Sequence, residues 1–93
     1  MLQARQDKDP YYWLGIGLDY LQRENYQEAI DALEHAQALT TGFEEVHRYL
    51  AIAYWRAGKQ AEAKKQLALL ASLRPGGPGL AALSKKINKA PRD

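Results

Sequence analysis

An internal repeat constrains this chain more than any other feature of its sequence. When the sequence is shifted by 34 residues and laid on itself without a gap, identical residues coincide at several positions. The coincident pairs are Tyr20 with Tyr54, Glu28 with Glu62, Ala29 with Ala63, Leu33 with Leu67 and Leu39 with Leu73. A period of roughly 20 to 50 residues is typical of stacked supersecondary units. The chain is therefore expected to contain two copies of one unit.

The composition favours helices throughout. Ala and Leu dominate, together with Gln, Glu, Lys and Arg, which are strong helix formers. At 93 residues the chain is long enough for one domain with a single modest core. The fold class is therefore predicted to be all-α, with no large cleft between two lobes.

Local signals predict where five helices begin and end. Asp9-Pro10 starts the first helix, Gly58 ends the third in a left-handed conformation, and the fourth spans 60–73. A short fifth helix is expected over about 79–89, after a Pro- and Gly-rich turn. Two capping boxes are also predicted at the starts of the second and third helices, from Asn25 with Glu28 and from Thr41 with Glu44.

The residues at helical spacing resemble the tetratricopeptide repeat family. The first repeat supplies Trp13, Ile16-Gly17, Tyr20, Ala29, Leu33 and Ala36, and the second supplies Leu50-Ala51, Tyr54, Gly58, Ala63, Leu67 and Pro75. The resemblance implies a helical-repeat solenoid of two antiparallel helix hairpins. We expect the chain to divide into a flexible N-terminal segment (1–9), two repeats (10–43 and 44–77), a capping helix (78–89) and a tail (90–93).

Small residues at equivalent positions indicate how the paired helices pack. Gly17 and Ala29 in the first hairpin correspond to Ala51 and Ala63 in the second. Two helices approach closely only where one of the facing side chains is small. We therefore expect these residues to lie buried between paired helices, and Leu80, Leu83 and Ile87 to cover the second hairpin, because a hairpin cannot cover its own apolar face.

Charge is divided unevenly along the chain. Residues 1–47 carry three Lys or Arg against nine acids, a net charge of −6, whereas residues 48–93 carry ten against two, a net charge of +8. Such a chain can attract an acidic partner or a second copy of itself, or the charges can simply be solvated helix faces. The basic C-terminal residues (Lys85, Lys86, Lys89 and Arg92) have no base-stacking aromatic neighbours, so nucleic acid is not the expected partner.

The sequence predicts no enzyme, metal site or cofactor site. Cys is absent, and the pairs Asp31–His35 and Glu44–His47 each offer two ligands where zinc needs three or four. The glycines of 15–17 lie inside a predicted helix, so they do not form a dinucleotide-binding loop. No Ser–His–Asp arrangement and no phosphate-binding loop is present.

No targeting or membrane signal is visible. The N-terminus lacks the apolar region of a secretory signal, and no apolar stretch approaches the roughly 18 residues that span a bilayer. A cytoplasmic location is therefore expected, provided that the chain is not a piece of a longer, targeted protein.

The family resemblance implies a concave groove lined by the first helix of each hairpin. The candidate partner-binding residues on these helices are Tyr11, Leu14, Leu18, Leu21, Arg48, Tyr49, Ile52, Trp55 and Arg56, with Gln22 and Glu45 on the same side. Several are apolar although the core of each hairpin does not need them, and such surfaces usually mark contact sites. Alternatively, some of them pack on residues 1–8, on the closing helix or on further repeats.

These observations predict a non-catalytic protein-interaction module that binds a peptide or a partner helix in an apolar groove edged by arginine. The alternative is a structural role, either self-association as a homo-oligomer or a terminal part of a longer repeat scaffold.

Overall fold

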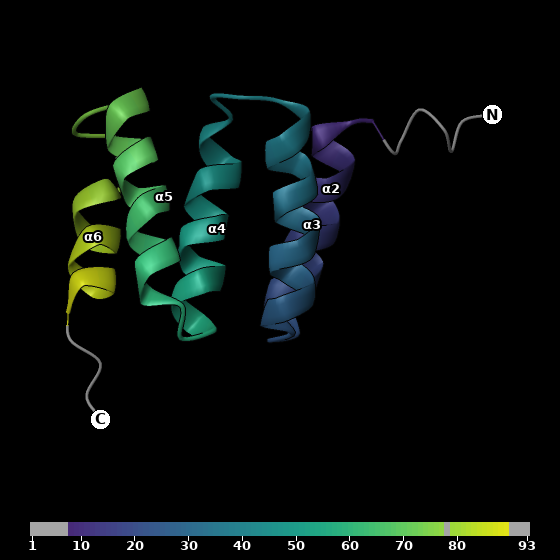
Figure 1. The fold of residues 1–93 in the computed structure, drawn as a ribbon, viewed down its shortest axis with the longest axis horizontal. Coiled ribbons are helices and arrows are strands. Elements are labelled where there is room, and N and C mark those ends of the chain that lie inside the picture. Colours follow the sequence, from purple (N-terminus) through teal and green to yellow (C-terminus); the bar gives the residue numbers. More distant parts are fainter. Residues whose placement is uncertain (1–7, 78, 90–93) are drawn as a thin grey trace.

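The described part of the molecule consists of helices joined by short turns (Figure 1). The computed structural model describes residues 8–77 and 79–89, and within these ranges it contains five helices and no strand. They are α2 (Pro10–Gln22), α3 (Tyr26–Leu39), α4 (Glu44–Arg56), α5 (Gln60–Leu73) and α6 (Leu80–Asn88). The predicted all-α fold is confirmed. The segments expected to be a flexible N-terminus (1–9) and a tail (90–93) lie outside the described residues, apart from Lys8 and Asp9.

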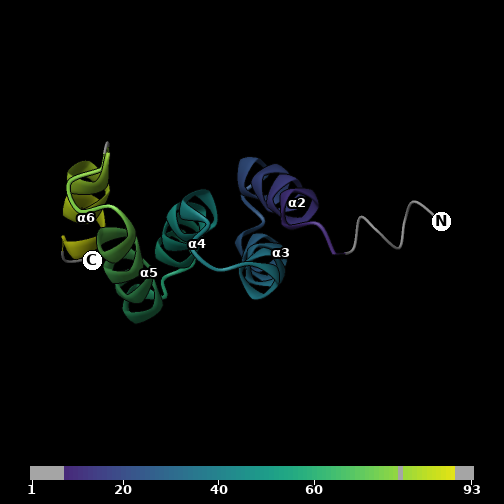
Figure 2. The same ribbon diagram turned by 90° about the horizontal axis from the view of Figure 1, so that it is seen from above.

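Successive helices stack into a short solenoid. α2 packs against α3 and α4 against α5, while α3 and α4 join the two hairpins and α6 packs on α5. Figure 2 shows α2, α4 and α6 along one side of the molecule and α3 and α5 along the other. The molecule measures 47 × 28 × 18 Å. The predicted solenoid of two hairpins and a short fifth helix is therefore confirmed, whereas the repeat boundaries at 10–43 and 44–77 stay predictions.

The helix starts are set by fewer side-chain caps than the sequence predicts. Asp9 caps α2 as expected, because its Oδ1 accepts a hydrogen bond from the Tyr11 amide at 3.0 Å. Both predicted capping boxes are wrong. Asn25 is the N-cap of α3 but its side chain makes no capping bond, and its own N–H donates to the Tyr20 carbonyl instead. The N-cap of α4 is Phe43, not Thr41, and it too lacks a side-chain bond.

The two hairpins turn in the same way. The residue after each helix cap has a positive φ, +63° at Glu24 and +82° at Gly58, which confirms the left-handed conformation predicted for Gly58. Both turns have the pair of backbone hydrogen bonds of a Schellman motif. The bonds are Glu24 N–H to Leu21 O (3.0 Å) and Asn25 N–H to Tyr20 O (2.9 Å) in the first turn, and Gly58 N–H to Trp55 O (3.1 Å) and Lys59 N–H to Tyr54 O (2.7 Å) in the second.

Small residues let the paired helices approach, as predicted. Ala29, Ala51 and Ala63 are fully buried. At Gly17 an added Cβ would lie 2.6 Å from Cγ of Leu33, which is closer than van der Waals contact allows. The first hairpin therefore requires glycine at this point, or a shift of the buried Leu33 side chain.

The short helix α6 covers the exposed side of the second hairpin. Ile87 is fully buried, and Leu80 and Leu83 pack against the main core. The side-chain amide of Gln60, at the start of α5, donates a hydrogen bond to the Ile87 carbonyl near the end of α6. The covering role predicted for these apolar residues is confirmed.

Three side-chain hydrogen bonds lie where α3, α4 and α5 meet, and the two that involve α3 join the hairpins. His47 Nδ1 lies 2.8 Å from Gln66 Oε1, and the Gln66 amide donates to Gln37 Oε1 at 3.1 Å. The Tyr54 hydroxyl donates to the Glu34 carboxylate. Burial, reinforced by this bond, raises the pKa of Tyr54 well above its usual range, so the phenol stays protonated and keeps donating.

Candidate functional site

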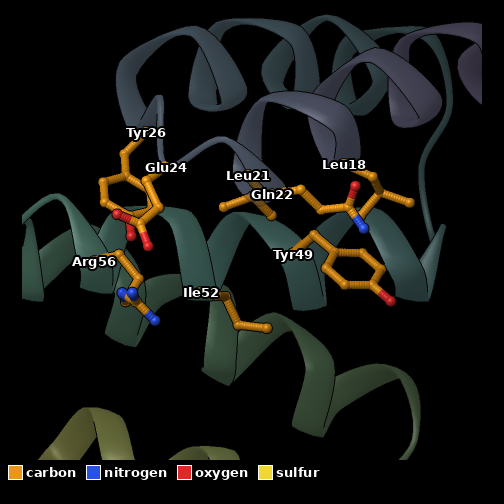
Figure 3. A pocket seen from close by; sticks show the side chains of 8 residues that line it. All are labelled: Leu18, Leu21, Gln22, Glu24, Tyr26, Tyr49, Ile52 and Arg56. Carbon is orange, nitrogen blue, oxygen red and sulfur yellow. The ribbon is translucent and has the colours of Figure 1, made fainter.

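A hollow opens between α2 and α4, on the side of the solenoid that these two helices share. Its volume is about 450 Å³. Figure 3 shows the eight residues that line it: Leu18, Leu21, Gln22, Glu24, Tyr26, Tyr49, Ile52 and Arg56. We call this hollow the α2–α4 groove.

The apolar part of the α2–α4 groove follows from helical spacing. Tyr49 and Ile52 are one turn apart on α4, and Leu18 and Leu21 are one turn apart on α2. All four side chains are partly exposed. Because α2 and α4 touch only lightly, these side chains face a gap that the protein itself does not fill.

One end of the groove is charged. The guanidinium carbon of Arg56 lies 5.3 Å from the ring centre of Tyr26 and 6.0 Å from that of Trp55, distances at which cation–π attraction operates. Glu24 reaches the same end of the groove from the turn between α2 and α3 (Figure 3). Among the described residues, the ion pairs involve neither Arg56 nor Glu24. Both charges are therefore available to a ligand.

Five of the nine predicted binding residues line the groove: Leu18, Leu21, Tyr49, Ile52 and Arg56. Gln22, expected on the same side, lines it as well, whereas Glu45 does not.

The other four predicted residues are not among those that line the groove. Leu14 and Trp55 are partly buried against the core. Tyr11 is 67% exposed and contacts Phe43 edge to face, with ring centres 4.9 Å apart. Arg48 lines a separate small hollow where α4 meets α5 and α6. Of the two arginines predicted to edge the α2–α4 groove, Arg56 lines it and Arg48 does not.

Two lining residues, Glu24 and Tyr26, are absent from the sequence-based set. The sequence pattern indicates only a helix boundary at the turn between α2 and α3. The repeat offered one signal, because the 34-residue shift places Glu24 on Gly58, so a charged residue stands where the second hairpin has a turn glycine.

The described residues offer no metal centre and no membrane span. No group of three or more His, Cys, Asp or Glu within 8–77 and 79–89 is placed to hold a metal ion. His35, considered above with Asp31, stacks on Trp13 with ring centres 4.3 Å apart. In the same ranges, each helix is too short or too polar to cross a bilayer.

Comparisons with known proteins point to one family. A family model described as tetratricopeptide repeat matches residues 20–87, well over half of the chain. Cilia- and flagella-associated protein 70 of Homo sapiens and of Macaca fascicularis are each 42% identical to this chain over 53 residues. The matched stretch covers 57% of this chain but only 5% of each relative. No solved structure matches significantly.

Proposed function

The chain belongs to the tetratricopeptide repeat family, and we propose that it is a non-catalytic module that binds a peptide or partner helix in the α2–α4 groove. The repeats of this family form an interaction fold that generally mediates contacts between proteins.

The observation that supports the proposal most is the apolar lining of the groove. Leu18, Leu21 and Ile52 are partly exposed around a hollow of about 450 Å³, a size that accommodates a few side chains of a ligand. Removing such side chains from water stabilises a complex by roughly 25 cal/mol for each Å² of apolar surface. An amphipathic segment with apolar side chains at helical spacing fits two facing stripes of this kind.

Arg56 supplies the polar part of the proposed contact. Its guanidinium is held beside Tyr26 and Trp55 and so loses less freedom when it binds a carboxylate than a mobile side chain would. We therefore propose an acidic group on the partner near this end. The proposal includes no catalysis, cofactor, membrane or nucleic acid, and it places the module in the cytoplasm.

A phage-displayed library of random peptides tests the proposal. The wild type and Ile52→Asp are panned in parallel, because a carboxylate at the centre of the groove opposes burial of an apolar ligand side chain. Leu69→Asp is the matched control, since Leu69 is also partly exposed but lies on α5, away from the groove. We expect the Ile52→Asp protein to lose affinity for wild-type-selected peptides by on the order of tenfold or more, and the control to keep it.

Equal binding by all three proteins, each shown to be folded by circular dichroism, would place the binding site outside the groove. Light scattering across concentration tests the alternative role. A wild-type dimer that Ile52→Asp dissociates and Leu69→Asp leaves intact would show that a second copy occupies the groove.

A further inference from the structure

We propose that Glu24 is a specificity residue of the α2–α4 groove and selects partner segments that carry a Lys or Arg beside their apolar anchor. This inference rests on the proposed function. It identifies the partner as an amphipathic segment with charges of both signs at one end, an acid facing Arg56 and a base facing Glu24.

The first observation is the backbone at Glu24. Its φ of +63° lies in the left-handed region, which side chains with a Cβ rarely adopt. Gly58, the equivalent residue of the second hairpin, adopts nearly the same φ of +82°. The two turns also have the same pair of Schellman hydrogen bonds. Glycine adopts the backbone conformation of this turn without strain. Glu24 therefore has a conformational free-energy cost that Gly58 does not have.

The second observation is that the fold does not use the Glu24 carboxylate. Glu24 is exposed, and the hydrogen bonds and ion pairs of the described residues include its backbone N–H but not its side chain. That N–H makes the same bond as the N–H of Gly58. Nothing in the packing of the described residues therefore compensates for the strain.

The third observation is where the side chain lies. Glu24 lines the groove at the end that also holds Arg56 and Tyr26 (Figure 3). Arg56 lies against the two aromatic rings and forms no ion pair with Glu24 within 4.0 Å. The groove thus presents two separate charges of opposite sign. Strain that persists at a ligand-binding position is commonly part of that position's function.

The chemistry of the partner follows from this pair of charges. An all-acidic segment would meet attraction at Arg56 and repulsion at Glu24, while a segment with one acid and one base satisfies both. Exposed charges at the rim of an interface add little affinity but discriminate between partners. Glu24 is therefore expected to change which segments bind more than how strongly the apolar anchor binds.

Charge reversal tests the proposal. The same phage-displayed library is panned against the wild type, Glu24→Lys and Glu24→Gly, with Glu28→Lys as the control for an equal change of charge on an exposed residue of α3. The wild type and the Glu28→Lys control are expected to enrich Lys and Arg beside the apolar anchor. Glu24→Gly is expected to lose that enrichment, and Glu24→Lys to enrich Asp and Glu instead.

A synthetic wild-type-selected peptide gives the quantitative measurement. The Kd of this peptide should be higher for Glu24→Lys than for the wild type, on the order of tenfold at low salt. The difference in Kd should shrink at high salt because exposed charges are screened. Thermal melting checks that every variant is folded.

The two proposals fail in different ways. If Ile52→Asp abolishes binding but Glu24→Lys enriches the same sequences as the wild type, the groove is the binding site and the role of Glu24 is overturned. If no enriched peptide depends on Ile52, the proposed function fails, and the inference about Glu24 fails with it.

Discussion

Two residues at equivalent positions of the repeat, Glu24 and Gly58, show how backbone conformation and side-chain identity compete. The turn requires a left-handed residue because the preceding helix ends in a Schellman motif. For a residue with a Cβ, this conformation costs roughly 1–2 kcal/mol. Gly58 avoids that cost, and Glu24 does not.

Substitutions at these two equivalent positions should therefore change the free energy of unfolding in opposite directions. We expect Glu24→Gly to stabilise the fold by about 0.5–1 kcal/mol, because the relief of strain exceeds the extra freedom of glycine in the unfolded chain. Gly58→Glu should destabilise it by about 1 kcal/mol. A Cβ at Gly58 would meet nothing within 4 Å, so backbone strain is the dominant effect there. Chemical denaturation of both variants measures the two changes.

A loss of stability in Glu24→Gly would contradict this interpretation. It would mean that the Glu24 carboxylate supports the fold, and its position in the groove would then need no functional explanation.

Residue-level prediction from the sequence succeeded where the cause is local. Asp9 caps the helix that follows it, and Gly58 adopts the left-handed conformation. The predicted box of Asn25 with Glu28 failed because the Asn25 N–H, which that box requires, closes the preceding turn by donating to Tyr20. A capping motif read from four residues does not take account of the helix before it.

At the scale of elements, α6 depends most on tertiary packing. It has only nine residues, and an isolated helix of that length is marginal in water. Ile87 is fully buried, and Leu80 and Leu83 pack against the core. α6 should therefore melt together with the hairpin that it covers.

Paired alanine substitutions on α6 test this dependence. Ile87→Ala should destabilise the whole fold by about 2–4 kcal/mol, because it removes buried methyl groups and leaves a cavity. Lys86→Ala, one residue earlier and exposed, should change stability by less than about 0.5 kcal/mol. Denaturation curves followed by circular dichroism make the comparison. Similar curves for the two variants would show that α6 is an accessory to the folded unit.

Residue spacing alone could not fully predict which side chains of α4 point into the groove. Arg48 and Trp55 are seven residues apart and were both expected in the groove, but Trp55 packs against the core and Arg48 lies towards α6. α4 has α2, α3 and α5 as neighbours and approaches α6. Helical periodicity gives the angle between side chains, whereas the neighbours decide which angle points to solvent.

At the scale of the whole molecule, one repeat position changes character along the solenoid. Ala53 and Ile87 are fully buried, and both are equivalent to Asp19, which is exposed and pairs with Arg23 at 3.0 Å. The side of α2 that bears Asp19 is thus polar. The equivalent sides of α4 and α6 are apolar, and each packs on the preceding helix. Leu18 and Leu21, two partly exposed apolar side chains of α2, lie instead on the side of α2 that faces α4.

Residue-by-residue mapping of a bound peptide tests the central claim, that the α2–α4 groove is the binding site. The nitrogen-15-labelled protein is titrated with a wild-type-selected peptide, and backbone amide shifts are followed by nuclear magnetic resonance. We predict that the largest changes fall on Leu18, Leu21, Ile52 and Arg56. Changes concentrated on the exposed faces of α3 and α5, with these four amides unmoved, would contradict the claim.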